Sequence, residues 1–284
     1  VNGQRVPLPE HQPRLNCNTP AFQVDITRYL RPEGEKNTIY VATSPEDLPG
    51  DAARAGLQDN VWLCTRPLRN FGNPRVFSFV KARKLRIDFH GGTLPESFDG
   101  MLEFTFRDAA TGETVHTERR PFAPTVTLDY VTPKLWSVDE PNLYYLDCRL
   151  TSNGAGIVDA ATLRFGFREL TAENGRFLLN GKPVMVNTDS SWQGMWAPLW
   201  HTMENMTRKS IRLMKLFGIN AAYTQRMNAA SFYDIADEEG FLCIERIELT
   251  YDEYNTHTAE ECLALWRSLA REAVDSGRFD NHPS

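Results

Sequence analysis

The sequence lacks the features that would mark a membrane-spanning, nucleic-acid-binding or nucleotide-binding protein. Its longest apolar runs, such as Phe177–Leu179 and Phe241–Ile244, fall far short of the roughly 20 residues that a membrane-spanning helix needs. The net charge is −6 and no basic patch stands out, which disfavours nucleic acids and anionic membranes as partners. No glycine-rich phosphate-binding pattern is present, which disfavours a nucleotide cofactor.

Closely spaced metal ligands are also missing. The five cysteines form no CxxC pair and are odd in number, which excludes a paired disulfide framework and a cysteine zinc site: Cys17, Cys64, Cys148, Cys243 and Cys262. The six histidines are too scattered for a metal cluster: His11, His90, His116, His201, His257 and His282. We therefore predict no metal site, and we interpret the cysteines as scattered buried thiols.

The chain has neither a start methionine nor a signal-peptide pattern. Its opening, Val1-Asn2-Gly3, looks like the middle of a longer protein. The missing signal therefore says nothing about compartment, and both cytoplasm and periplasm fit the sequence.

Residues 1 to about 160 contain short segments that alternate apolar and polar side chains, with turn residues between them. Such segments predict strands at 22–26, 38–41, 61–63, 84–89, 102–106 and 125–128. Many short strands at this spacing are typical of β-sandwiches. The length allows part of a first sandwich and the whole of a second, joined near Arg66-Pro67.

From about residue 168 the pattern changes to strands that alternate with helices. Strands are expected at 184–187, 219–223 and 241–247, and Asn180-Gly181 predicts a type I′ hairpin turn before them. A helix over 202–217 should carry Met206, Leu213 and Phe217 on one face, and one over 231–239 should point Phe232, Ile235 and Ala236 inward. A capping box at 258–261 opens a third helix, which ends at Gly277 and shares one face among Cys262, Leu265, Trp266, Leu269 and Ala273.

Three strand–helix repeats predict a parallel sheet with right-handed crossovers. Three units alone would leave an open edge of unpaired backbone groups. An eight-unit barrel needs roughly 250 residues, and residues 168–284 supply fewer than half of them. We therefore expect more units to follow Ser284.

Five stretches of the sequence occur in an order that one enzyme family shares. They are 22–27 with 37–39, 56–63, 135–144 (LWSVDEPNLY), 165–184 (FGFRE then FLLNGKPV) and 232–240 (FYDIADEEG). Each resembles a segment of glycoside hydrolase family 2, the family of β-galactosidases and β-glucuronidases. The resemblance implies part of a jelly-roll sugar-binding domain over 1–66, an immunoglobulin-like β-sandwich over 67–167, and the first three βα units of a (β/α)8 TIM barrel over 168–284.

Residues 278–284 (RFDNHPS) resemble the family's run that precedes the catalytic acid/base glutamate. The resemblance implies that this glutamate follows within about ten residues and that the nucleophile lies on a later strand. A retaining glycosidase needs both carboxyl groups, about 5 Å apart across the scissile bond. We therefore expect no catalytic residue in this chain, which should be inactive alone, and we expect the parent protein to hydrolyse β-linked glycosides with retention.

Candidate substrate contacts lie in the loops after the predicted strands, because a barrel binds its substrate at that face. Aromatic rings stack on the C–H faces of sugars while polar neighbours bind the hydroxyls. The candidates are Asp189, Trp192, Trp196, Gln225, Arg226, Glu248 and Tyr251. Each has a structural alternative: packing for the tryptophans, a turn or helix cap for Asp189, and for Glu248 an ion pair with Arg246 or Arg226.

The same loops depart from the family pattern. Residues 187–192 replace an RGxNRHE-like run, residues 223–228 replace RxSHYP, and Glu245-Arg246 replace the pair DE. Galactose or glucuronate specificity therefore does not carry over, and a non-catalytic carbohydrate-binding homologue is the second hypothesis. An adhesion module ranks last because it leaves the strand–helix repeats unexplained. The expected partner is a carbohydrate. The retaining mechanism requires no cofactor, although some relatives bind metal ions near the site.

Overall fold

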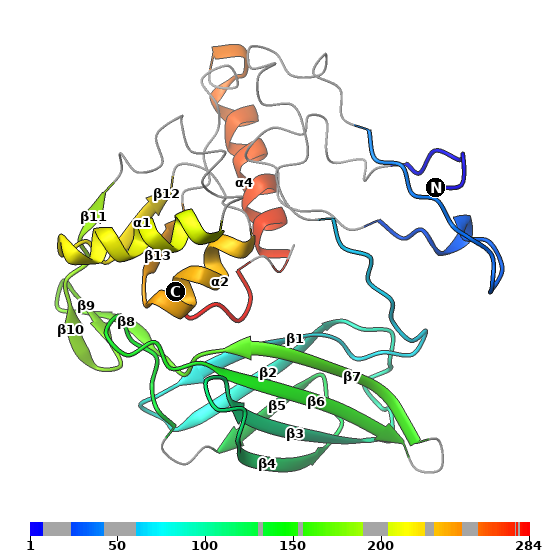
Figure 1. Cartoon of the computed structure of the whole chain (residues 1–284), viewed down its shortest axis with the longest axis horizontal. Coiled ribbons are helices and arrows are strands. Elements are labelled where there is room, and N and C mark those ends of the chain that lie inside the picture. Colours follow the sequence, from blue (N-terminus) through cyan, green and yellow to red (C-terminus); the bar gives the residue numbers. More distant parts are fainter. Residues whose placement is uncertain are drawn as a thin grey trace. The chain divides into compact units, whose positions relative to one another are not determined.

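The computed structural model describes residues 1–7, 24–42, 61–129, 133–152, 156–189, 204–224, 230–245, 255–275, 277 and 279–284 (Figure 1). The chain divides into two compact units. The larger comprises Val61–Tyr223, Ala230–Ile244 and Phe279–Ser284. The smaller comprises Val1–Asn60, Thr224–Ala229 and Glu245–Arg278.

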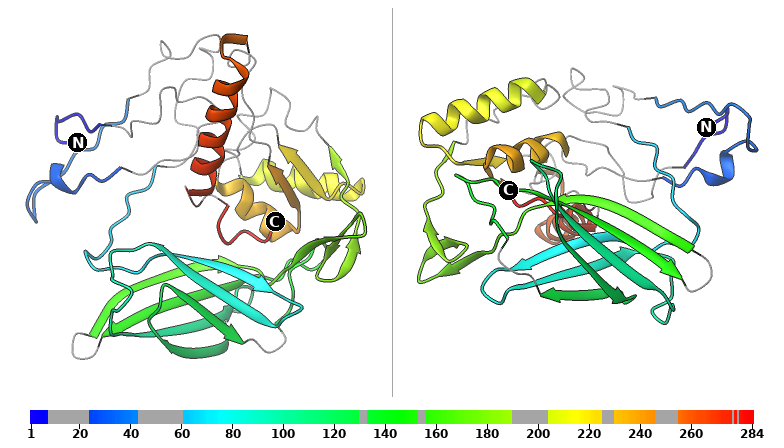
Figure 2. Two further views of the ribbon diagram at one scale, coloured as in Figure 1. Left: turned by 180° about the vertical axis from the view of Figure 1, so that it is seen from behind. Right: turned by 60° about the horizontal axis from the view of Figure 1, so that its bottom comes forward.

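A two-sheet β-sandwich forms the first part of the larger unit (Figure 2). One sheet has the order β1-β2-β5, with β1 at Gly72–Phe79, β2 at Lys84–Gly91 and β5 at Thr125–Asp129. The other has the order β4-β3-β6-β7, with β3 at Met101–Asp108, β4 at Thr114–Pro121, β6 at Tyr144–Ser152 and β7 at Gly156–Phe165. All neighbouring strands in both sheets run antiparallel.

Alternation along the strands builds the sandwich core. Every second side chain points between the sheets, as in Leu85 and Ile87 of β2 or Leu102, Phe104 and Phe106 of β3, all of them at most 4% exposed. This confirms the predicted strands at 84–89, 102–106 and 125–128 and the sandwich that they imply.

A small antiparallel sheet of order β10-β9-β8 follows the sandwich, with β8 at Leu170–Glu173, β9 at Arg176–Leu179 and β10 at Lys182–Val184. Asn180 and Gly181 join β9 to β10 with φ angles of 55° and 77°. Two positive φ angles are what a type I′ turn requires, and glycine and asparagine tolerate them best. The predicted hairpin turn is confirmed.

A second three-stranded sheet has the order β11-β12-β13, with β11 at Thr188–Asp189, β12 at Ala221–Thr224 and β13 at Leu242–Glu245. β11 pairs in parallel with β12, and between the strands run α1 at Glu204–Leu216 and α2 at Ala230–Glu239. The expected first strand, 184–187, is wrong: Val184 pairs with Phe177 of β9, and Met185 is 77% exposed. The tight hairpin keeps Val184 in β10, so the parallel strand begins at Thr188.

The apolar face that the sequence predicted on α1 is not the buried face of the helix. The three residues predicted to share that face are 38%, 55% and 76% exposed: Met206, Leu213 and Phe217. The three that are buried follow the spacing i, i+4, i+7: Thr207, Ile211 and Met214. Both stripes carry apolar side chains, so periodicity alone could not choose between them. In α2 the predicted residues Phe232, Ile235 and Ala236 are buried as expected.

The smaller unit has fewer regular elements among its described residues. They are a 3-10 helix at Thr27–Tyr29 and the helix α4 at Ala259–Asp275. The Thr258–Glu261 capping box is confirmed by hydrogen bonds in both directions, of 2.8 Å and 3.3 Å. Of the residues predicted to share one face of α4, Cys262 and Ala273 are buried, whereas Trp266 is 43% exposed.

Two strands that the sequence predicted are absent from the described residues of the N-terminal region. Residues 38–41 and 61–63 form no strand, and Tyr40 and Trp62 are 83% and 76% exposed. A strand needs a neighbour to pair its backbone groups, and the backbone bond described for residues 38–41 is one from the Asn2 amide to the Thr38 carbonyl. Within the described residues, no helix has both the length and the apolar composition to cross a membrane.

Candidate functional site

The sequence predicted substrate contacts in the loops that follow β11, β12 and β13. These strands end at Asp189, Thr224 and Glu245. Asp189 closes β11, but its side chain is outside the described part of the structure. So are all atoms of the other six predicted contacts, namely Trp192, Trp196, Gln225, Arg226, Glu248 and Tyr251. All seven stay predictions.

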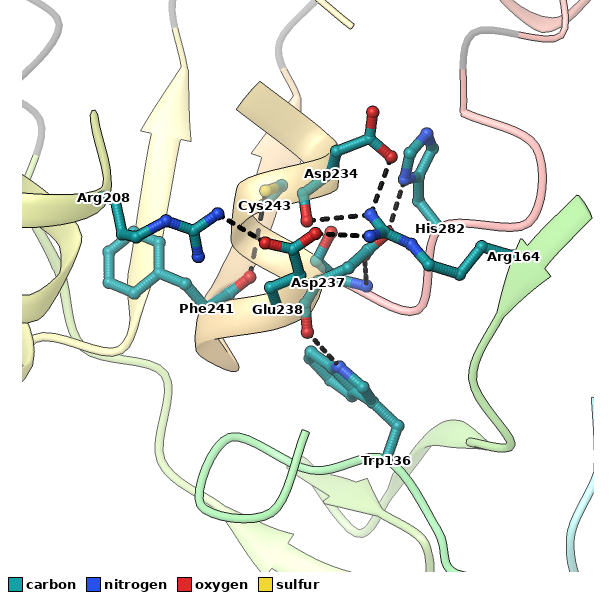
Figure 3. A network of polar contacts seen from close by, with 10 residues as sticks. Trp136, Arg164, Arg208, Asp234, Asp237, Glu238, Phe241, Cys243 and His282 are labelled. Carbon is teal, nitrogen blue, oxygen red and sulfur yellow. Dashed lines mark hydrogen bonds and ion pairs between the residues drawn. The ribbon is translucent and has the colours of Figure 1, made fainter. Parts of the chain in front are cut away.

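The acidic side of α2 organises a network of ion pairs and hydrogen bonds (Figure 3). Asp234, Asp237 and Glu238 recur at helical spacing, and therefore project from one side of the helix. Gly240 ends the helix with a φ of 65°, a conformation that glycine adopts without strain. The sequence FYDIADEEG thus supplies both the carboxylates and the stop signal.

Two arginines from other elements meet these carboxylates. Arg164 of β7 donates to Asp234 Oδ1 at 2.8 Å and also binds Glu238. Arg208 of α1 binds Glu238 and donates to Glu239 Oε1 at 2.7 Å. Burial opposes ionisation of Glu238, but the hydrogen bonds from both arginines outweigh it and hold the pKa of Glu238 below its ordinary value. The pairs tie α2 to the sandwich and to α1.

Asp237 is the most enclosed acid of the network, with a side chain only 3% exposed. Its Oδ2 lies 2.6 Å from His282 Nδ1, and its Oδ1 accepts a 3.0 Å hydrogen bond from the Ser284 amide. With Asp237 ionised, its Oδ2 accepts this hydrogen bond and His282 Nδ1 donates it, because an ionised carboxylate can only accept. The Asp237 carbonyl accepts a 2.8 Å hydrogen bond from Trp136 Nε1. Asp237 therefore joins α2 to the connection between β5 and β6 and to residues 279–284.

Residues 279–284 are held along most of their length. Asp280 pairs with Arg75 at 2.6 Å. The Asn281 side chain accepts from the Val76 amide at 2.7 Å and donates to the Pro74 carbonyl at 3.0 Å, and so satisfies backbone groups of the edge strand β1. The Phe279 and His282 rings pack against Tyr233 of α2.

The contacts of this network suit a role in holding structural elements together. Asp234, Asp237 and His282 bring ligand atoms within 4.8 Å of one another, a donor set that a divalent metal could use. Arg164 already supplies positive charge there, bound to Asp234 and 4.0 Å from Asp237. Within the described network every carboxylate meets a basic side chain, an arrangement that ties α2 to β7, to α1 and to residues 279–284.

Sequence reasoning identified the two segments that meet here but not their contacts. FYDIADEEG and RFDNHPS were both recognised as family-like, and the pairing of Asp237 with His282 spans 45 residues. No spacing rule within one sequence connects side chains that far apart.

Comparisons with known proteins agree with this architecture. Residues 100–168 match the sequence model of the Glycosyl hydrolases family 2. A protein of Formosa agariphila named "Putative beta-glucuronidase" is 31% identical over 93% of this chain, and the chain spans 26% of that protein.

Solved structures show the same fold. A β-glucuronidase from Ruminococcus gnavus, in complex with D-glucuronic acid, superposes with a TM-score of 0.58 at 22% identity, over 75% of this chain and 35% of that one. A glycosyl hydrolase family 2 member from Bacteroides cellulosilyticus gives 0.55 at 21% identity, over 76% and 29%. The family match lies on the sandwich, and the relatives extend the likeness along most of the sequence. This chain belongs to glycoside hydrolase family 2.

Proposed function

We propose that this chain is part of a glycosidase that hydrolyses β-linked O-glycosides with retention of configuration. The observation that carries the proposal is the extent of the likeness: one named β-glucuronidase relative matches 93% of the chain, across both the sandwich and the strand–helix region. The chain spans about a quarter of that relative, so the activity belongs to a longer protein.

In this proposal, β11, β12 and β13 are the first strands of a (β/α)8 barrel. The parallel pairing of β11 with β12, the order of the three strands and the helices between them support it. The preceding sandwich takes the place of the immunoglobulin-like domain, over 67–167. Residues 1–66 take the place of part of the jelly-roll domain.

The chemistry requires two glutamates, which we place in the longer protein outside this sequence. One donates a proton to the leaving oxygen, and the other attacks the anomeric carbon to form a glycosyl-enzyme. This chain's part is to hold the sugar. Trp192 and Trp196 would stack on its C–H faces, and Asp189, Gln225, Arg226, Glu248 and Tyr251 would bind its hydroxyl or carboxylate groups.

The test is a substrate panel on the longer protein and on residues 1–284. Aryl β-D-glucuronides, β-D-galactosides and β-D-glucosides are offered, and proton NMR reads the anomer that is released first. We expect turnover with the β anomer of the sugar as first product from the longer protein, and none from residues 1–284. The α anomer would refute retention, and turnover by residues 1–284 would refute the placement of the glutamates.

A second candidate function, carbohydrate binding without hydrolysis, is favoured by one observation. Residues 187–192 and 223–228 depart from the runs that the family resemblance implies at these positions. In that case the longer protein binds β-glycosides in calorimetry but shows no turnover. Its coding sequence would then lack at least one of the two glutamates.

A further inference from the structure

We propose that Asp237 is a positioning residue, whose carboxylate sets where the backbone at Ser284 joins the parallel sheet. The inference rests on the proposed function, because it concerns catalytic groups on a strand that continues from Ser284. Asp237 touches no substrate in this proposal and acts only through the segment that it holds.

The first observation is the way Asp237 grips this segment. Its two oxygens bind different groups two residues apart, the His282 ring nitrogen at 2.6 Å and the Ser284 amide at 3.0 Å. Two such contacts on a rigid carboxylate define both the position and the direction of the backbone between them. Because the Asp237 side chain is 3% exposed, water competes poorly for these bonds.

The second observation is where the segment goes. The Ser284 carbonyl accepts a 2.9 Å hydrogen bond from the Cys243 amide, and Cys243 lies inside β13. An amide of one strand bonded to a carbonyl of the next segment is the contact with which a neighbouring strand begins. β13 is an end strand of its described sheet, so the segment meets the sheet at an edge.

The third observation is that Asp237 is itself held firmly. Its carbonyl accepts from Trp136, a fully buried residue of the connection between β5 and β6, and the neighbouring Glu238 binds arginines of β7 and α1. The carboxylate is therefore fixed relative to the sandwich, to α1 and to β13. A strand that starts beside β13 would carry catalytic groups at its carboxyl end. Displacement of such groups by about 1 Å can lower the rate about 100-fold.

The test uses Asp237→Asn in the longer protein, with Glu239→Gln as the matched control. Glu239 lies on the same helix and is paired with two arginines, but its side-chain contacts go to α1. We expect Asp237→Asn to lower kcat about 10- to 100-fold with KM changed less than about threefold, and to speed hydrogen exchange of the Ser284 amide. Glu239→Gln should leave both near the wild-type values.

A second pair of variants guards against misfolding of Asp237→Asn. Asparagine places its side-chain N–H where the histidine Nδ1–H lies, so His282→Asn should recover most of the kcat that His282→Ala loses. A merely structural role would lower the melting temperature of the two variants without separating their kcat values.

The outcomes separate the two proposals. An active wild type whose kcat survives Asp237→Asn overturns positioning and leaves the glycosidase function standing. A wild type without turnover overturns the proposed function and the catalytic part of this inference. In that case unchanged exchange of the Ser284 amide in Asp237→Asn would overturn the tether as well.

Discussion

Replacing Trp136 by phenylalanine should destabilise the larger unit more than any similar change at its surface. The indole is fully buried, and its Nε1–H donates at 2.8 Å to the Asp237 carbonyl. Asp237 lies in the last turn of α2, where carbonyl groups lack helical partners. Trp136 thus caps the helix from the connection between β5 and β6, and phenylalanine has no donor to replace it.

Two terms set the size of the effect. Leaving the buried Asp237 carbonyl without its donor costs about 1–3 kcal/mol. The smaller ring loses part of the transfer and packing energy of the indole, about 1 kcal/mol beside the 3–5 kcal/mol of a full truncation to alanine. We expect a loss of about 2–4 kcal/mol in the free energy of unfolding.

The assay is urea unfolding followed by far-ultraviolet circular dichroism, because the variant itself changes the fluorescence. The control is Trp62→Phe, at a position that is 76% exposed, which should shift the free energy by less than about 0.5 kcal/mol. A loss below about 1 kcal/mol for Trp136→Phe, or equal losses for both variants, would refute the capping argument.

Two further predictions concern α2. Gly240→Ala should lower the free energy of unfolding by about 3 kcal/mol or more, because the new Cβ would lie 2.3 Å from the Val138 carbonyl oxygen at a φ of 65°. The control is Gly175→Ala, with a φ of 72° and open space around it, which should lower it by only about 1 kcal/mol. Equal unfolding midpoints for the two variants would contradict this prediction. Burial opposes ionisation of Glu238 and Glu239, but hydrogen bonds from arginines outweigh it and lower the pKa of both carboxyls below 4.5. The ionised pairs therefore stabilise the folded state fully above about pH 4.5. This stabilisation is lost as the pH falls through the lowered pKa values. The double variant with glutamine at both positions should flatten the decline in unfolding free energy below pH 4.5, and an unchanged decline would assign it to other acids.

The sequence predicted those parts of the fold that depend on local patterns. Alternation located β2, β3 and β5, because one face of each strand must be apolar to fill the sandwich. Asn180-Gly181 predicted its turn because few residues tolerate two positive φ angles. In α2, one apolar stripe opposes an acidic one, so its buried face was unambiguous.

The predictions that were wrong concern features that depend on packing or pairing with other elements of the fold. α1 carries two apolar stripes, and the one that is buried is the one with Ile211 and Met214. Val184 could belong to a hairpin or to a parallel strand, and the tight turn before it decided for the hairpin. At residues 38–41 an alternating pattern exists, but the strand is not formed in the structure.

The same distinction between local patterns and long-range contacts applies to the candidate site. Sequence by itself determined the family and the order of its motifs, because each motif is a local run of residues. Tertiary structure alone decided that Asp237 meets His282 and that Arg164 meets Asp234, contacts that span 45 and 70 residues. The charge of an acid does not specify which base it pairs with, because any acid and any base attract each other in the unfolded chain. The folded backbone decides the pair, because it places the two side chains side by side.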